Sequence, residues 1–242
     1  MNELLFVEDQ GAVRVLTLNR PEKLNALNTA LTQALVDGLR AADQAAHVHV
    51  VVLTGAGRAF CAGADTSEFK SLTPAHAERV AARSQLTKQS HLLFSQMHTP
   101  VISAVRGAAM GGGAGLALAA DICIASDTLK LGYPEIQHGI LPAIVLTNLT
   151  RQIGRKAAFE LVARGQSIGA DRALALGAIN RVVADAQLMQ EALTLAQELA
   201  AHPPDALFAL KRLFHSVVDQ PLAAGLELGR KANIEMRAAH SG

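Results

Sequence analysis

The chain has 242 residues, of which 50% are hydrophobic and 18% are charged, a composition typical of a globular protein with one main domain. Its 22 Lys and Arg residues balance 21 Asp and Glu residues, which argues against a nucleic-acid partner or an anionic membrane partner. Cys61 and Cys123 form no CxxC pair, so we expect neither a disulfide scaffold nor a metal site. Residues 1–4 lack the features of a signal peptide, and we expect a cytoplasmic protein.

Strand and helix patterns alternate along the first 184 residues. The run at 49–54 is apolar almost throughout, which is typical of a strand covered on both faces. Helical patterns alone then follow, so the sequence predicts an α/β core over residues 1–184 and a C-terminal helical region over 185–242. In chain order, the predicted elements are a hairpin of strands 4–7 and 13–18, helix 29–43, strand 49–54, helix 74–96, strand 101–105, helix 116–120, strands 122–125 and 129–132, helices 144–153, 155–163 and 170–176, strand 179–183, and helices 185–201, 205–218 and 221–242.

A glycine block with a downstream acid is the most informative local feature. The block, Gly111-Gly112-Gly113-Ala114-Gly115, lies between the apolar run 101–105 and the small-residue helix 116–120, and Glu135 follows it. A glycine turn that starts a helix gathers unpaired backbone N–H groups, and the helix dipole favours negative charge there. A carboxylate beside such donors suits chemistry next to a carbonyl, because it carries a proton near a charge-stabilising site.

The glycine block has two other interpretations. Glycines also allow tight packing of a helix on a sheet without any ligand. A dinucleotide-binding turn has the same strand–glycine–helix context, but the block does not match G-x-G-x-x-G and lies in mid-chain, outside a first βα unit. The motifs around the block favour the first interpretation, a site for an anion.

Four blocks occur together over roughly residues 4–185. They are Leu18-Asn19-Arg20-Pro21-Glu22-Lys23-Leu24-Asn25-Ala26-Leu27; Val52-Leu53-Thr54-Gly55 running into Arg58-Ala59-Phe60-Cys61-Ala62-Gly63-Ala64-Asp65; the glycine block with Asp121-Ile122; and Gly132-Tyr133-Pro134-Glu135. In order and spacing they resemble the crotonase superfamily, the enoyl-CoA hydratase/isomerase family.

The resemblance implies a fold and a chemistry. The family's fold is a crotonase-like spiral of ββα turns with a C-terminal helical region that makes trimers, often paired into hexamers. Its shared chemistry is formation of a thioester enolate, stabilised by two backbone N–H groups, which by motif position are those of Ala64 and Gly112 here. Preorganised donors favour this state because charge reaches the oxygen only as the C2 proton leaves. Glu135 matches the glutamate that carries the proton.

Gly115 departs from the pattern of the family's hydratases, which hold and activate water with two glutamates. Gly115 stands at the place of the first glutamate, one helical turn from Gly112, so we expect room in the pocket and the loss of one base. One carboxylate suffices to move a proton between C4 and C2, which slightly favours 3-enoyl to 2-enoyl isomerisation. Hydration stays open, because some hydratases and hydratase-lyases use the second glutamate alone. A catalytically impaired member that binds acyl-CoA or a partner is a further alternative.

Substrate contacts follow from the same resemblance. Tyr133 either lines the acyl pocket or belongs to the core, and Lys23 either approaches CoA or is a solvated lysine. No metal or redox cofactor is implied, because coenzyme A arrives as part of the acyl-CoA thioester. The expected substrate and CoA contacts are Lys23, Ala26, Ala62, Ala64, Asp65, Gly111, Gly112 and Pro134.

The C-terminal helices carry a candidate contact face. Apolar residues recur there at Leu213, Val217, Leu222 and Leu226. They indicate either the buried face of a homo-oligomer, a trimer or a hexamer, or an ordinary helix packing face. We expect no nucleic-acid and no membrane partner.

Overall fold

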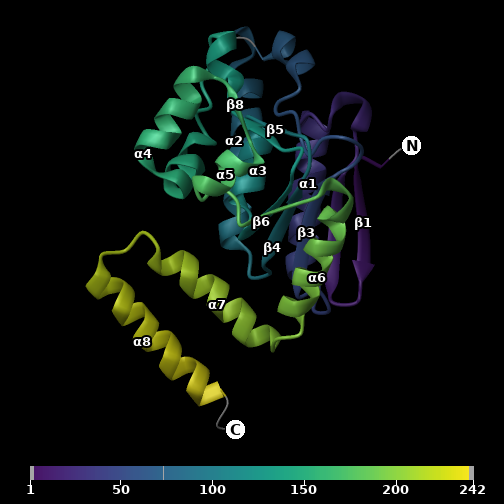
Figure 1. The fold of residues 1–242 in the computed structure, drawn as a ribbon. Helices are drawn as coiled ribbons and strands as arrows, with labels where there is room; N and C mark the ends of the chain where they lie inside the picture. The colour runs from purple at the N-terminus through teal and green to yellow at the C-terminus, as the bar shows by residue number, and fades with distance from the viewer. Residues whose placement is uncertain (1–2, 73, 240–242) are drawn as a thin grey trace.

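Two β-sheets and the helices around them form the body of the protein in a computed structural model (Figure 1). The structure describes residues 3–72 and 74–239, so the expectations for Met1, Asn2 and residues 240–242 lie outside the described residues. The arrangement confirms the predicted α/β class with a helical C-terminal region.

The larger sheet has six strands in the order β1-β2-β3-β4-β6-β9. β1 and β2 form the predicted antiparallel hairpin, and every other neighbouring pair is parallel. β3 points Val51 and Leu53 into one apolar cluster and Val50 and Val52 into another, which explains its continuous apolar run. The strands are β1 (Leu5–Gln10), β2 (Val13–Leu18), β3 (Val50–Gly55), β4 (Val101–Val105), β6 (Ile122–Ser126) and β9 (Arg181–Val183).

The smaller sheet joins β5 (Ala108–Met110), β7 (Lys130–Gly132) and β8 (Ser167–Gly169), of which only β7 is predicted from the sequence. Because of β5, the strand directly before the glycine block is not the apolar run 101–105. The apolar run 101–105 is β4 of the larger sheet, and a turn at Gly107, with φ of +55°, carries the chain into the smaller one. The glycine block therefore follows a strand at the edge of the smaller sheet.

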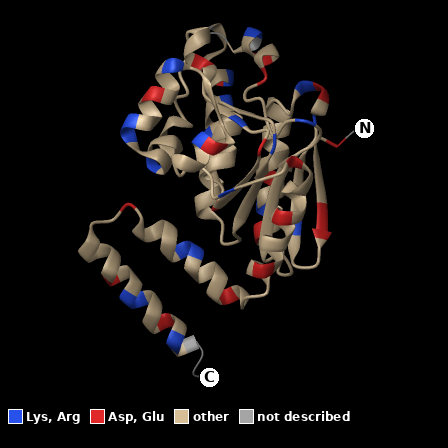
Figure 2. Ribbon diagram, in the orientation of Figure 1, with Lys and Arg blue, Asp and Glu red and all other residues tan. Residues whose placement is uncertain are grey.

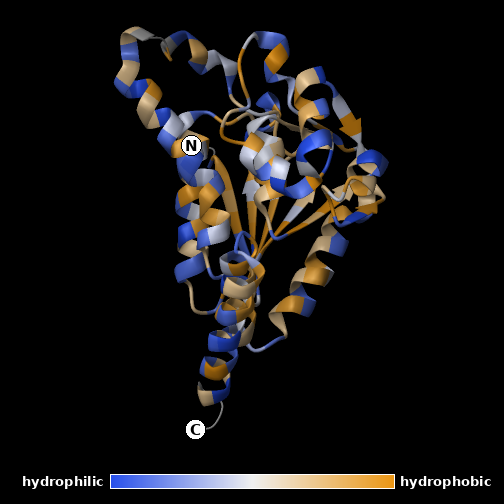
Figure 3. Cartoon of the chain, turned by 90° about the vertical axis from the view of Figure 1, so that its left-hand side faces the viewer, coloured by the Kyte–Doolittle hydropathy of each residue, from blue (hydrophilic) through white to orange (hydrophobic). Residues whose placement is uncertain are grey.

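Helices cover both faces of the larger sheet. α1, α2 and α3 pack on the face that carries Val51 and Leu53, and α6 packs on the opposite face through Leu188 and Leu195. Figure 3 shows hydrophobic strands between helices of mixed hydropathy. The division predicted at residue 185 stays a prediction, and α6, which follows it, lies against the sheet. The helices are α1 (Thr29–Gln44), α2 (Ala77–Gln96), α3 (Gly112–Ala119), α4 (Leu146–Arg164), α5 (Ala170–Ala175), α6 (Leu188–Ala200), α7 (Pro204–Val217) and α8 (Leu222–Ala239).

α4 is broken at Gly154. This residue has φ of +76° and ψ of 166°, which is not a helical conformation. The sequence predicts two helices that meet there, at 144–153 and 155–163, and the break confirms that division.

α7 and α8 form a hairpin that projects from the body of the protein (Figure 1), while Leu207 near the start of α7 packs into the same apolar cluster as Val50 and Val52. α7 is joined to the core by buried Lys211, whose Nζ lies 2.8 Å from the Asp121 carboxylate, and by His215, whose Nε2 lies 2.9 Å from the same group. α8 packs on α7 and leaves Leu222 80% exposed and Leu226 66% exposed. These apolar side chains are thus not covered by the described part of the chain.

Charge is mixed over the surface. Lys and Arg residues lie among Asp and Glu residues on most helices (Figure 2). Over the described ranges, each helix is too short or too polar to cross a bilayer.

Candidate active site

The first predicted donor, the amide of Ala64, lies on a short parallel bridge between Ala64 and Leu27. Leu27 donates its N–H to Gly63 O at 2.7 Å and accepts from Asp65 N at 3.1 Å, so the bridge uses the residues on either side of Ala64. In a parallel bridge one residue makes both hydrogen bonds, here Leu27, and the residue opposite, Ala64, points its own N–H away from the partner. Ala64 is exposed, and within the described residues its N–H has no hydrogen-bond partner.

The second predicted donor, the amide of Gly112, is the first N–H of α3. Gly111 before it adopts φ of +50° and ψ of −116°, a conformation that requires glycine. Gly111 N donates to Gly132 O at 2.8 Å, and Gly115 N donates to Gly111 O at 2.9 Å. The Gly112 N–H has no partner among the described residues, as expected at a helix start, and the helix dipole adds positive potential there.

The two donor segments are in direct contact. Cys61 N donates to Ala108 O and Met110 N donates to Cys61 O, each at 3.0 Å, which pairs the Ala64 segment with β5. Gly63, with φ of +94°, lies so close that a Cβ there would be 3.7 Å from Gly112 N. The structure therefore brings Ala64 and Gly112 together, as a shared oxyanion site requires.

Glu135 lies beside this pair. It belongs to a short 3-10 helix, Pro134–His138, that Pro134 starts. Its carboxylate packs on Gly111, where a Cβ would overlap Oε1, and its Oε2 is buried without a hydrogen-bond partner among the described residues. Burial raises the pKa of Glu135, while its own backbone N–H and the charge of His138 lower it to a smaller extent. A carboxyl with a raised pKa is a better proton acceptor than an exposed one.

The space beside Gly115 is filled, which corrects the expectation that it leaves room. A Cβ at Gly115 would lie 2.5 Å from Val145 Cγ1 and 2.7 Å from His91 Nε2. Both side chains are buried, His91 from α2 and Val145 from the residue before α4. The sequence could not reveal this, because these residues are distant along the chain and show no local pattern.

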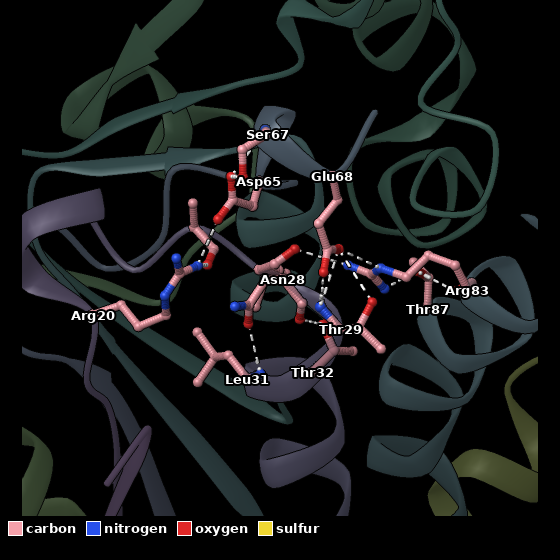
Figure 4. Close-up of polar contacts among 12 residues, drawn as sticks. Arg20, Asn28, Thr29, Leu31, Thr32, Asp65, Ser67, Glu68, Arg83 and Thr87 are labelled. Atoms are coloured by element: carbon pink, nitrogen blue, oxygen red, sulfur yellow. Dashed lines mark hydrogen bonds and ion pairs between the residues drawn. The ribbon is translucent and has the colours of Figure 1, made fainter. Parts of the chain in front are cut away.

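Several expected substrate contacts lie together around the Ala64 loop. Ala62 N donates to Leu24 O at 2.9 Å, and Arg20 donates to Ala26 O at 2.6 Å and to Asp65 at 2.8 Å (Figure 4). Asp65 is thus engaged in bracing the loop, as its hydrogen bonds from the Ser67 hydroxyl and backbone also show. The Ser67 hydroxyl is the largest cause that lowers the pKa of Asp65 to about 2.

The remaining candidates divide between core and surface. Tyr133 is fully buried, with an Oη that has no partner among the described residues. Cys61 is buried, and burial raises the pKa of its thiol to about 12, which fits a packing role. Lys23 and His138 are exposed, Lys23 in the turn before α1 and His138 at the end of the Glu135 helix.

An apolar cavity of about 1050 Å³ opens next to the Glu135 helix. Ile136, directly after Glu135, forms part of its wall, and α4 forms another part. The other apolar residues that line it include Leu141, Pro142, Leu146, Phe159 and Val162.

The molecule is therefore a mixed α/β protein in which two backbone N–H groups, unpaired within residues 3–72 and 74–239, lie beside a half-buried glutamate. The chain belongs to the enoyl-CoA hydratase/isomerase family, whose model matches residues 8–241. It is 37% identical to the 2,3-dehydroadipyl-CoA hydratase of Escherichia coli, over 96% of this chain and 89% of that protein. It is 36% identical to a putative enoyl-CoA hydratase of Thermus thermophilus, over 95% of this chain and 90% of that protein.

Solved structures agree with the family assignment. The crystal structure of an enoyl-CoA hydratase from Bacillus anthracis superposes with a TM-score of 0.91 at 32% identity, covering 96% of this chain and 90% of that chain. An enoyl-CoA hydratase from Mycobacterium smegmatis gives a TM-score of 0.92 at 30% identity, with coverage of 96% and 90%. The crotonase fold predicted from the four sequence blocks is confirmed.

Proposed function

We propose that the protein forms the enolate of an enoyl-CoA thioester, with Glu135 as its single proton-carrying carboxylate. The thioester oxygen would lie between the N–H groups of Ala64 and Gly112. As the C2 proton moves, negative charge develops on that oxygen, and two preorganised donors stabilise it more than the ground state. The observation that supports this proposal most directly is the buried Glu135 Oε2 beside the start of α3, which has no hydrogen-bond partner in the described part of the chain.

The surroundings of Glu135 suit a base. Burial raises its pKa, so its carboxylate holds a proton more strongly than an exposed glutamate does. The cavity beside Ile136 would accept the acyl chain, because most of the residues that line it are apolar. Coenzyme A arrives with the substrate, and this chemistry requires no metal or redox cofactor.

Isomerisation between 3-enoyl-CoA and 2-enoyl-CoA is the reaction that we slightly favour. His91 and Val145 fill the volume next to Gly115, so a second carboxylate is absent at that place and the protein occupies its space. Hydration is the second candidate, because the relatives above are named hydratases. Both reactions place an enolate oxygen between the same two donors, a dienolate in isomerisation and a 3-hydroxyacyl enolate in hydration, and both use Glu135.

A direct assay separates the two reactions. The protein is incubated with a 2-enoyl-CoA and, in parallel, with the matching 3-enoyl-CoA, and water addition and double-bond migration are followed by mass and absorbance. Isomerisation faster than hydration supports the favoured candidate, and rapid water addition to the 2-enoyl substrate contradicts it.

The glutamate is tested with Glu135→Gln. This variant should bind acyl-CoA as the wild type does, while turnover falls by about 10²–10⁴-fold because general acid–base catalysis is lost. Glu198→Gln, the same change at an exposed position on α6, is the control and should be fully active. Unchanged turnover in Glu135→Gln would contradict the mechanism.

We also propose that the protein is a homo-oligomer, a trimer or a hexamer. The exposed apolar residues Leu222 and Leu226 of α8, with Phe214 and Leu210 of α7, support a surface that a second copy covers. Light scattering on the purified chain measures the mass, and a monomer at micromolar concentration would contradict this proposal.

A further inference from the structure

One face of α2 carries three polar residues in series. Arg83, Thr87 and His91 recur at intervals of four, which places them on the same side of the helix. Arg83 Nη1 donates to Thr87 Oγ1 at 2.7 Å, and His91 Nδ1 lies 2.8 Å from Thr87 O. This face, which we call the α2 polar face, contacts both segments that supply the candidate oxyanion donors.

Arg83 contacts the Ala64 segment. Its Nη2 donates to Leu27 O at 2.8 Å, and Leu27 is the residue that bridges to Ala64. The same Leu27 oxygen accepts from Asp65 N, directly after Ala64. Glu68 lies 3.5 Å from the Arg83 guanidinium and accepts from Thr29 N at the start of α1 (Figure 4). Arg83 is thereby held against Leu27, whose backbone pairs with the residues on both sides of Ala64.

His91 contacts the Gly112 segment. Its Nε2 lies 3.2 Å from Gly112 O, in the space that a side chain at Gly115 would take. The imidazole is 6% exposed, and burial lowers its pKa, so the ring is neutral and carries one N–H. Nδ1 faces Thr87 O at 2.8 Å and Nε2 faces Gly112 O at 3.2 Å, so the single ring proton is donated to one of these two carbonyls. Thr87 O also accepts from the Ser90 hydroxyl at 2.8 Å.

We propose that Arg83 and His91 are positioning residues that hold the Ala64 and Gly112 donors at a fixed separation from a single helix face. Neither side chain touches the reacting atoms in this proposal, which rests on the proposed function. Arg83 donates to Leu27 O, and in this proposal the His91 proton lies on Nε2 and is donated to Gly112 O, 3.2 Å away. Oxyanion stabilisation depends steeply on donor geometry, so residues that position both donors affect turnover more than substrate binding.

A matched pair of substitutions tests His91. The terminal amide of glutamine lies as many bonds from Cα as Nε2 does, whereas that of asparagine corresponds to Nδ1. His91→Gln should keep the hydrogen bond to Gly112 O and retain a kcat near that of the wild type. His91→Asn should lose that bond, and its kcat should fall by about 10- to 100-fold with little change in KM. Equal kcat values in the two variants would overturn the role of His91.

Arg83 is tested in the same way. Arg83→Met should lower kcat with little change in KM, whereas Arg79→Met, a change of the same kind at an exposed position on α2, should leave both constants unchanged. An unchanged kcat in Arg83→Met would overturn the role of Arg83. Thermal melting of each variant identifies losses that come from unfolding alone, because those lower the melting temperature and the amount of active enzyme together.

A measurement on the unchanged chain needs no variant. Histidine-selective ¹⁵N NMR should show His91 protonated at Nε2, and a bare Nε2 would overturn its part in the proposal even if both His91 variants failed to fold. The proposed function fails separately. If the wild type turns over neither enoyl-CoA, that function is wrong. If the wild type is active but His91→Gln and His91→Asn do not differ, only the positioning role of His91 is contradicted.

Discussion

The two sides of the first turn of α3 contrast sharply although glycine forms both. At Gly111 the bare backbone faces Glu135, whose Oε2 is buried without a partner among the described residues, and next to it Gly112 presents its N–H. At Gly115 the missing Cβ is replaced by His91 and Val145, which leave no space. A glycine can thus expose the backbone to a ligand or admit another part of the protein, and only the atoms around it distinguish the two cases.

The side of α3 that carries Gly111 and Gly112, which we call the open side, is tested most strongly by removing the Gly112 N–H. Gly112 is the first residue of α3, where proline is well tolerated and its missing N–H breaks no helical bond. Gly112→Pro should therefore fold but lose about 10²–10³-fold in kcat, the usual effect of deleting one oxyanion donor.

Gly112→Ala is the control for that change. It keeps the N–H and adds a Cβ that would lie 3.3 Å from Leu27 Cδ1, a flexible side-chain end that can move by a few tenths of an ångström. Its kcat should stay well above that of Gly112→Pro. Equal losses in the two variants would show that packing, and not the donor, matters on this side.

The side at Gly115, which we call the filled side, is tested by adding one methyl group to this residue. Gly115→Ala should destabilise the fold by about 1–3 kcal/mol, because the added Cβ overlaps Val145 and His91 in a packed interior. Val145→Ala made together with it should recover part of that loss. Chemical denaturation measures both. Gly229→Ala on α8, where no atom of the described residues lies within 4 Å of the new Cβ, is the control that should be neutral or stabilising.

The smallest effect concerns charge near the open side. Glu135 must be a carboxylate to accept a proton, and burial raises its pKa, so kcat/KM should fall as the pH drops through a value above that of an exposed glutamate. The charge of His138 lowers the pKa of Glu135, so His138→Gln should raise it and move this acid limb to higher pH. A pH profile beside that of exposed His202→Gln measures the shift, and a limb that moves to lower pH would contradict it.

Much of the fold is predictable from the sequence, because long elements leave periodic patterns. The apolar run of β3 indicates its cover on both faces, and Gly154 separates the two halves of α4 as predicted. β5 and β8 are not predictable in this way, since each has three residues and neither lies in a β-rich run, whereas β9, equally short, lies in the strand-like stretch 179–183.

The site is predictable only where a motif is continuous. Ala64, Gly112 and Glu135 lie in recognisable blocks, and the structure brings them together as expected. His91 and Arg83 have no such signal, because a single polar residue on a helix commonly has a structural role. Their contacts with Gly112 and Leu27 depend on how α2 packs, which local sequence does not specify.

The most direct test of the central claim is exchange of the C2 proton. A saturated acyl-CoA cannot be hydrated or isomerised, so its C2 hydrogen exchanges with deuterated water only through the enolate. The wild type should catalyse this exchange, and Glu135→Gln should lose it while still binding the thioester. Exchange at the wild-type rate in Glu135→Gln would contradict the assignment of Glu135 as the proton carrier beside the Ala64 and Gly112 donors.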